Sequence, residues 1–296
     1  MIGRISTFQF NQNGMASILD AQQRVSQLQE QIGTGKRVLT PSDDPAAAAQ
    51  LLNLKSELAR VESQQKNIAS LNSALSLEET NLDSANSLLI RVRELTIQGQ
   101  NGTLSPSDRG AIANEIDGLR EQLLSIANAQ NADGEYIFAG SATDEPANSV
   151  NGFFQGNDVV RRVNIGANVA VASGHSGTEV FESISGGANV FAVLSDLSEA
   201  LRQNDQGLVS DQFVNIDNAI EQVSSVRTSV GVRMNWIDDQ AALNDNFNLD
   251  LQRTMSEIED LDIADAIGRL QLQMVSLQAA QQTFVKTQNL SLFNYL

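Results

Sequence analysis

Few side chains in this chain of 296 residues could carry acid–base, nucleophilic or metal chemistry. There is a single histidine, His175, and no cysteine, so no disulfide, thiolate nucleophile or zinc–thiolate site can form. Any catalytic triad or imidazole relay would depend on His175 alone. This residue lies in the segment ASGHSGTE, whose small residues predict an exposed turn with a structural or solvent-facing histidine. We therefore expect no catalytic residue.

Two groups of carboxylates could be imagined as cation sites. Asp43 and Asp44 precede Pro45, and Asp44 is expected to cap a helix whose first residue is that proline, which explains both without a metal. A second group lies near residue 260 and lacks the glycine and the spacing of a calcium loop, so it predicts a solvated helix face or a hinge. Its members are Glu257, Glu259, Asp260, Asp262 and Asp265. The sequence predicts no metal site and no cofactor.

The overall charge and hydropathy exclude two classes of partner. Lys and Arg number 19 against 36 Asp and Glu, a formal net charge of −17, which argues against binding along a phosphate backbone. No apolar run approaches the ~20 residues of a membrane span. The first residues, MIGRISTFQF, lack the apolar core of a Sec-type signal. We expect no nucleic acid and no membrane among the partners.

The elements that must position the side chains are long helices. Apolar residues recur every three or four positions over 18–32, 51–82, 213–258 and 263–284, the spacing of coiled coils and long bundles. One helix is expected from Pro45 to Gly99. A shorter one, capped by Ser105 with Asp108 as its capping-box partner, is expected to end near Ala129. Polar residues interrupt the apolar seams and are expected to constrain register and partner.

Residues 135–189 differ in character from the rest of the chain. Short β-branched or aromatic stretches alternate there with Gly, Asn, Asp and Ser, and strands are expected in YIFAG, VNGFF, DVVRRVNI and NVAVA. The predicted fold is mainly α, a long antiparallel helical bundle or coiled coil built from both chain ends with a small inserted β-rich domain. The three parts expected are terminal helices (1–40 with 260–296), long helices (41–134 with 190–259) and the insert (135–189).

The two ends of the chain each carry a one-sided apolar stripe that must be buried. One interpretation is that the ends pack only on each other. The other, which we favour because the ends are rich in Gln, Asn and Ser and marginal as an isolated pair, is burial against other subunits after ordering of ends that are disordered in the monomer. The predicted assembly interface consists of Ile18, Val25, Leu28, Ile32, Ile267, Leu270, Met274, Leu277 and Phe284.

Three long stretches carry a family resemblance. Residues 4–48 read RISTFQFNQNGMASILDAQQRVSQLQEQIGTGKRVLTPSDDPAAA, and residues 88–119 read LLIRVRELTIQGQNGTLSPSDRGAIANEIDGL. The chain ends in AIGRLQLQMVSLQAAQQTFVKTQNLSLFNYL. Together they resemble the flagellin family of bacterial flagellar subunits. The last stretch and the insert are most similar to the family's hook–filament junction members.

The resemblance implies a structural subunit outside the cell that joins hook to filament. It implies export through the flagellar type III apparatus without a cleaved signal. The implied partners are the hook-side junction protein (hook-associated protein 1), flagellin, neighbouring copies of the chain and a flagellar export chaperone. The candidate chaperone-binding residues are Leu270, Leu277 and Phe284, in the helix-in-groove mode.

Two alternatives remain open. The nearer one is filament flagellin, against which the modest insert and the ending SLSLFNYL argue. The remote one is an enzyme housed in the β-rich insert, against which the residue inventory argues.

Overall fold

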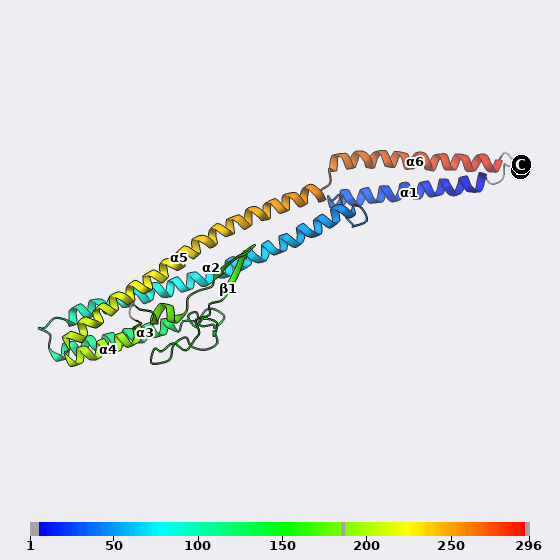
Figure 1. Ribbon diagram of the computed structural model, residues 1–296. Helices are drawn as coiled ribbons and strands as arrows, with labels where there is room; N and C mark the ends of the chain where they lie inside the picture. Colours follow the sequence, from blue (N-terminus) through cyan, green and yellow to red (C-terminus); the bar gives the residue numbers. More distant parts are fainter. Residues whose placement is uncertain (1–5, 185–186, 294–296) are drawn as a thin grey trace. The chain divides into compact units, whose positions relative to one another are not determined.

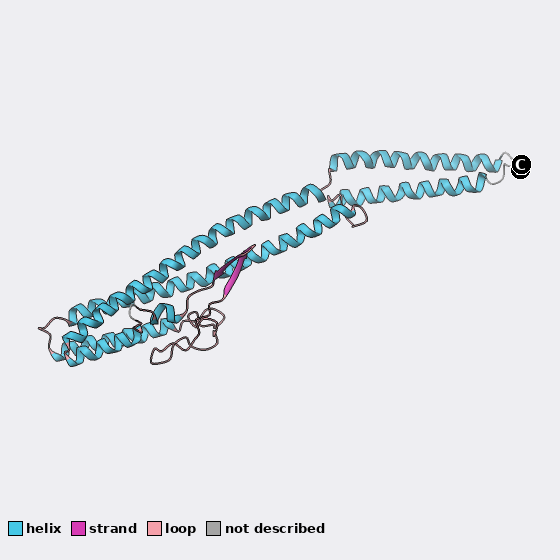
Figure 2. Cartoon of the chain, in the orientation of Figure 1, coloured by secondary structure: helices cyan, strands magenta, loops and turns pink. Residues whose placement is uncertain are grey.

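The computed structural model describes residues 6–184 and 187–293 of the chain. Helices account for most of them, and the sheet is small (Figure 2). The expected mainly-α fold with long helices from both chain ends is therefore confirmed. Along the chain the elements are α1 (Ser6–Thr34), α2 (Pro45–Gly99), α3 (Pro106–Ala127), β1 (Arg162–Gly166), β2 (Val169–Ala172), the π-helical turn η1 (Thr178–Glu182), α4 (Val190–Gln203), α5 (Gln206–Glu259) and α6 (Ile263–Phe293) (Figure 1).

Side-chain caps fix where α2 and α3 begin. Asp44 Oδ1 accepts a hydrogen bond from the backbone N of Ala47 at 3.0 Å, so α2 starts at the proline that follows the aspartate. Ser105 and Asp108 form a reciprocal capping box, each side chain accepting from the other residue's backbone N at 3.2 Å. Both caps satisfy backbone donors that have no partner inside the helix.

The chain divides into two compact units. The first contains residues up to Arg60 and from Phe247 onward, and the second contains Val61–Asn246. Helices α2 and α5 contribute residues to both units. The division into three parts that the sequence suggested stays a prediction.

The second unit contains the large hydrophobic core. Helix α3 packs against α4, and leucines and isoleucines of α2, α3, α4 and α5 are buried among the phenylalanines of the insert. Fully buried large side chains include Leu75, Leu82, Leu89, Ile116, Leu123, Phe138, Phe181, Phe191 and Leu194. Phe181 contacts both Phe138 and Phe191, with ring centroids 5.5 and 5.8 Å apart.

The inserted segment contains less strand than the sequence suggested. Within the described residues the sheet consists of β1 and β2, an antiparallel pair with a register shift between Asn164 and Gly166. Strands expected in YIFAG and VNGFF are absent there, and the prediction of them was wrong. Tyr136 and Phe154 instead form single bridges to Gln130 and Asn148, because turns on either side return the chain before a ladder can grow.

His175 is buried, so the prediction of an exposed turn was wrong. Its Nδ1 lies 2.8 Å from Oε1 of Glu78 on α2, and its Nε2 lies 3.4 Å from Oγ of Ser229 on α5. The side chain is 0% exposed and that of Glu78 is 4% exposed. The histidine thus links the insert to two helices of the second unit, in agreement with a structural role.

In the first unit, α1 and α6 lie side by side (Figure 1). A separate small cluster consists of Val38, which follows α1, and of Ala47 and Leu51 in α2. It packs against Met255 and Ile258 near the C-terminal end of α5. The first unit therefore contains two thin apolar contacts in place of one large core.

Candidate assembly surface

The contact between α1 and α6 uses the stripes that the sequence picked out. Among the residues whose side chains the structure describes in these two helices, those that are buried are Ala21, Val25 and Ala266. Around them lie partly buried residues of the same stripes: Ile18, Leu28, Ile32, Leu270, Leu277 and Phe284. Two long helices that bury only two alanines and a valine on each other form a weak core.

The structure divides the nine predicted interface residues between two environments. Seven of them lie on the sides of α1 and α6 that are buried or partly buried. Ile267 and Met274 are 42% and 45% exposed and lie at the edge of the α6 stripe. Their burial between subunits, and the binding of a chaperone to Leu270, Leu277 and Phe284, stay predictions.

A second apolar surface on the helix pair was missed by the sequence reasoning. On α6, Leu272 is 74% exposed, Val275 64% and Val285 56%. Leu272, Val275 and Ala279 recur at three- and four-residue spacing, so they share a face of α6 on the other side from the buried stripe. That spacing was the available signal, because it gives α6 a second stripe. On α1, Met15 and Leu19 are also exposed. We call the three residues Leu272, Val275 and Ala279 of α6 the outer apolar face.

One glycine sets how closely α1 and α6 approach. A Cβ added to Gly14 would lie 2.9 Å from Cδ2 of Phe284, which is closer than side chains tolerate. Phe284 therefore rests against bare backbone of α1, and a larger residue at position 14 would push its ring away.

A short backbone bridge of two hydrogen bonds joins the segment that follows α1 to the chain between α5 and α6. The N of Arg37 donates to the O of Glu259 at 2.7 Å, and the N of Leu261 donates to the O of Gly35 at 2.9 Å. Gly35 has a φ of +72°, the left-handed conformation usual for a glycine that ends a helix. The segment after α1 and the segment between α5 and α6 are thus hydrogen-bonded to each other.

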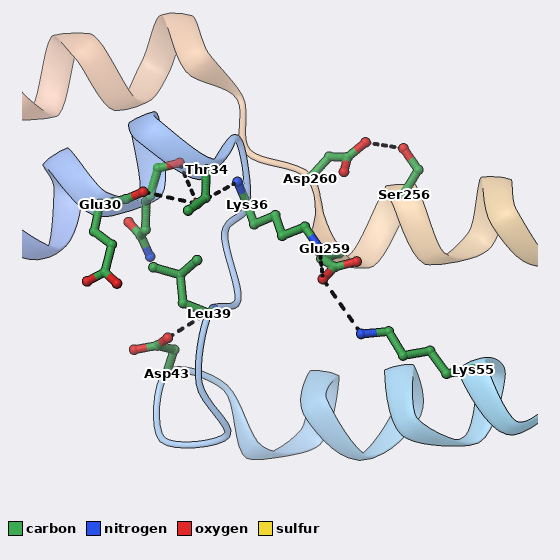
Figure 3. A network of polar contacts seen from close by, with 10 residues as sticks. Glu30, Thr34, Lys36, Leu39, Asp43, Lys55, Ser256, Glu259 and Asp260 are labelled. Carbon is green, nitrogen blue, oxygen red and sulfur yellow. Dashed lines mark hydrogen bonds and ion pairs between the residues drawn. The ribbon is translucent and has the colours of Figure 1, made fainter.

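Ion pairs surround this bridge (Figure 3). Glu259 Oε1 lies 2.7 Å from Nζ of Lys36 and 3.9 Å from Nζ of Lys55. Arg37 donates to the O of Ile258 at 2.9 Å and pairs with Asp44 at 3.2 Å. The three basic side chains are about half exposed, whereas Glu259 is 13% exposed. Solvent around the cations keeps the contribution of each pair small.

The loop between α1 and α2 is organised by its two aspartates. Asp43 Oδ2 accepts from the backbone N of Thr40 at 2.8 Å and of Leu39 at 3.1 Å, and these bonds, that of Thr40 first, lower the pKa of its carboxyl group. The bond from the N of Ala47, followed by the contact with Arg37, lowers the pKa of Asp44. Hydrogen bonds to the charged form account for both shifts.

The acidic group near residue 260 has structural tasks. Glu259 pairs with the two lysines, Asp260 accepts from Ser256, and Asp262 caps α6 by accepting from the N of Ala264 at 3.0 Å. Within the described part of the chain, no group of three or more His, Cys, Asp or Glu is arranged to hold a metal ion.

None of the helices in the described residues combines the length and the hydropathy that crossing a bilayer requires.

Two family models match most of the chain. The bacterial flagellin N-terminal helical region matches residues 5–143, and the bacterial flagellin C-terminal helical region matches residues 213–296. The chain belongs to the flagellin family. The matched ends contain α1 and α6, and the unmatched stretch contains both strands, so both terminal helices belong to regions that the family models describe.

Relatives of the family differ in how much of the chain they match. The flagellar hook-associated protein 3 of Escherichia coli is 31% identical over 98% of both chains. The flagellin of Bacillus subtilis is 27% identical over 85% of both. A putative flagellar hook-associated protein from Vibrio parahaemolyticus, of known structure, is 31% identical with a TM-score of 0.69 and covers 74% of this chain and 100% of its own. The resemblance to the junction members is therefore confirmed.

Proposed function

We propose that this chain is a structural subunit of the bacterial flagellum that joins hook to filament, with no catalytic role. The observation that carries the proposal is the match to hook-associated protein 3 over nearly the whole length of both chains, insert included. Flagellin matches less of the chain and at lower identity, which argues against a filament subunit. The location we propose is outside the cell, at the boundary between hook and filament.

The terminal helix pair is the proposed assembly element. Its buried side is thin and its outer apolar face is exposed, so neighbouring copies, flagellin and the hook-side junction protein, hook-associated protein 1, would cover surface that one chain leaves open. We propose that the ends are loosely held in the free chain and become ordered on docking, the ordering cost being offset by this burial. Assembly would then depend on a template.

Export adds a second use for α6. The residues proposed to bind an export chaperone, Leu270, Leu277 and Phe284, are on the side of α6 that packs against α1. A chaperone groove that accepts this stripe must displace α1. Chaperone binding and the folded helix pair would therefore exclude each other. The chaperone would keep the chain from assembling before export, and the export that we propose uses no cleaved signal.

Immunogold labelling of flagella in the source bacterium tests the proposed location. A tag placed in the exposed turn at residues 132–134 should give one band at the hook–filament boundary. Label along the whole filament would contradict the proposal and support filament flagellin. A deletion strain should secrete flagellin into the medium and carry hooks without filaments.

Substitutions on α6 test the assembly surface. We expect Leu272→Asp, on the outer apolar face, to abolish filament attachment while the purified chain keeps its helical content. Leu277→Asp, on the buried side, should abolish attachment and also open the helix pair, leaving the second unit folded. Gln271→Asp is the matched control, because it adds the same charge at an exposed neighbouring position. If cells that carry Leu272→Asp are as motile as cells that carry Gln271→Asp, the proposal that the outer apolar face is an assembly surface is contradicted.

A further inference from the structure

The sequence contains three Asn-Gly pairs, and the structure makes them chemically unequal. They are Asn13–Gly14 in α1, Asn101–Gly102 in the turn between α2 and α3, and Asn151–Gly152 in the insert. Asparagine followed by glycine is the pair most open to attack of the next backbone nitrogen on the side-chain amide carbon, because glycine offers no Cβ to hinder the approach. We propose that Asn101 is the site at which the folded chain undergoes spontaneous deamidation.

The reaction needs only water as co-reactant. The backbone nitrogen of Gly102 loses its proton and forms a bond to Cγ of Asn101, and the side-chain nitrogen leaves as ammonia, closing a five-membered succinimide. Water then opens the ring at either carbonyl and gives aspartate or isoaspartate at position 101. No atom is oxidised or reduced, and each site gains one mass unit and one negative charge.

The attacking nitrogen at Gly102 is free to move. Apart from its two chain neighbours, no residue has an atom within 4 Å of a Cβ built on Gly102, and among the described residues no hydrogen bond involves its N. Asn101 is exposed, in a turn closed by the bond from the N of Leu104 to the O of Asn101 at 3.1 Å. Rotation of the 101–102 peptide therefore breaks the single bond accepted by its O and none made by its N–H, whereas at residues 151–152 both groups are bonded.

The amide of Asn101 is also polarised for attack. Its Oδ1 accepts from the backbone N of Thr103 at 3.1 Å and from the Oγ1 of Thr103 at 2.8 Å. Negative charge develops on this oxygen when the nitrogen of Gly102 adds to Cγ. Two donors already aimed at it lower the energy of that intermediate as an oxyanion hole does. Thr103 is thus a positioning and stabilising residue for the reaction.

Asn151 has the same sequence pair in a locked setting. The N of Gly152 donates to the O of Ser149 at 2.8 Å, and the O of Asn151 accepts from Arg120 at 3.2 Å. Gly152 is buried with a φ of +85°, and a Cβ there would lie 2.3 Å from Cβ of Phe191. Attack by this nitrogen requires the peptide to break from all of these contacts. Asn13 is helical, so its rate depends on the state of α1, and Asn151 is the proper reference.

The product would alter the connection between α2 and α3. Position 101 follows the carboxyl end of α2, where a new carboxylate meets the negative end of the helix dipole. Isoaspartate also lengthens the backbone by one methylene group within the turn that leads to the capping residue Ser105. Aged protein would therefore carry a changed turn at this one place.

Peptide mapping by mass spectrometry tests the proposal. The full-length folded chain is incubated at mildly alkaline pH and moderate temperature, and the deamidated fraction at each Asn-Gly pair is followed over time. Asn101 should deamidate at least about tenfold faster than Asn151; a tenfold ratio corresponds to a barrier difference of 1.36 kcal/mol. In urea the two rates should converge. An equal or faster rate at Asn151 in the folded chain would overturn the proposal.

Variants at Thr103 separate activation from mere exposure. Thr103→Val removes the hydroxyl donor and should slow deamidation of Asn101 several-fold, whereas Thr103→Ser should keep the wild-type rate. Circular dichroism of both variants should match that of the parent. Equal rates in Thr103→Val and Thr103→Ser would overturn the role given to the hydroxyl.

Discussion

Individual residues show where sequence patterns mislead. Glu78 is three residues after Leu75 and four before Leu82, both fully buried, so it occupies an apolar-face position of α2. That position was the available signal for a buried polar partner, and the partner is His175. The lone histidine could not be assigned from ASGHSGTE alone, because its small neighbours suit both an exposed turn and close approach to a helix. The approach to the helix is close, because a Cβ built on Gly174, the residue before His175, would lie 3.3 Å from Oε2 of Glu78 on α2.

Removing the histidine should destabilise the second unit strongly. His175→Ala leaves Oε1 of Glu78 buried without its hydrogen-bond partner, and an unsatisfied buried polar group costs about 1–3 kcal/mol. Urea unfolding followed by circular dichroism measures the loss. The double variant Glu78→Gln with His175→Ala should lose less than the sum of the single variants. Ser229→Ala, at the longer 3.4 Å contact, is the control and should cost under about 1 kcal/mol. A His175→Ala chain as stable as this control would contradict the structural role.

The aspartates of the loop between α1 and α2 predict an acid dependence. The pKa of Asp44 is lowered below its ordinary value of 3.8, chiefly by the bond from the N of Ala47. Its stabilisation is therefore complete above 3.8 and is lost as pH falls through the lower folded-state pKa. Asp44→Asn keeps a capping side chain but has no charge to lose. The Tm difference between parent and variant should be present at neutral pH and disappear once the pH falls below the lowered folded-state pKa of Asp44. A difference that grows on acidification would contradict the assignment.

At the scale of elements, the polar breaks in the helical seams pair with one another. Arg227 on α5 donates to Glu79 on α2 at 2.7 Å and lies 2.9 Å from Asp83. Further along, Arg93 pairs with Asp217 at 2.5 Å. Residue numbers rise along α2 as they fall along α5, so these contacts fix an antiparallel register. The seams and their polar interruptions were readable from the sequence, whereas the pairing across helices was not, because periodicity carries no register between two segments.

Charge reversal tests this register. Glu79→Arg and Arg227→Glu should each cost about 1.5–3 kcal/mol, the contribution of a hydrogen bond to a charged group. The double variant should recover part of the loss, because the exchanged charges again face each other. Chemical denaturation of all four chains gives the coupling energy. Additive losses would show that the two side chains do not interact.

The insert is the element that sequence reasoning described least well. Its chain is held by side chains from outside its own segment: Asn67 on α2 donates to the O of Asn164, and Asn244 on α5 donates to the O of Ile165, both at 2.9 Å. Arg233 donates to the O of Gly174 at the same distance. Single asparagines and an arginine that bind a distant backbone leave no periodic trace, so β-branched composition suggested more strand than forms.

At the scale of the whole molecule, the fully buried side chains are unevenly distributed. Among the described residues, the second unit holds the continuous core, whereas the buried apolar residues of the first unit are Ala21, Val25, Val38, Ala47, Leu51, Leu251 and Ala266. Little apolar area opposes opening of α1 and α6, so these helices are expected at the low end of local stability. We therefore expect α1 and α6 to open at a lower free-energy cost than the second unit does.

Limited trypsin digestion of the free chain checks this order. Cleavage after Arg24, Arg269 and Lys286, all on the terminal helices, should precede cleavage at the arginines of the second unit such as Arg91 and Arg227. Proteolysis at low protease concentration follows the population of the open form, so the ratio of rates reports the difference in opening free energy. Glu259→Gln removes ion pairs to two half-exposed lysines and should leave the order unchanged. Gly14→Leu drives a side chain into Phe284 and should speed cleavage at Arg24 and Lys286 while cleavage at Arg91 keeps its rate. Terminal sites that resist trypsin as well as Arg91 would show a preformed, stable helix pair. Assembly would then have to proceed through the outer apolar face alone, without ordering of the ends.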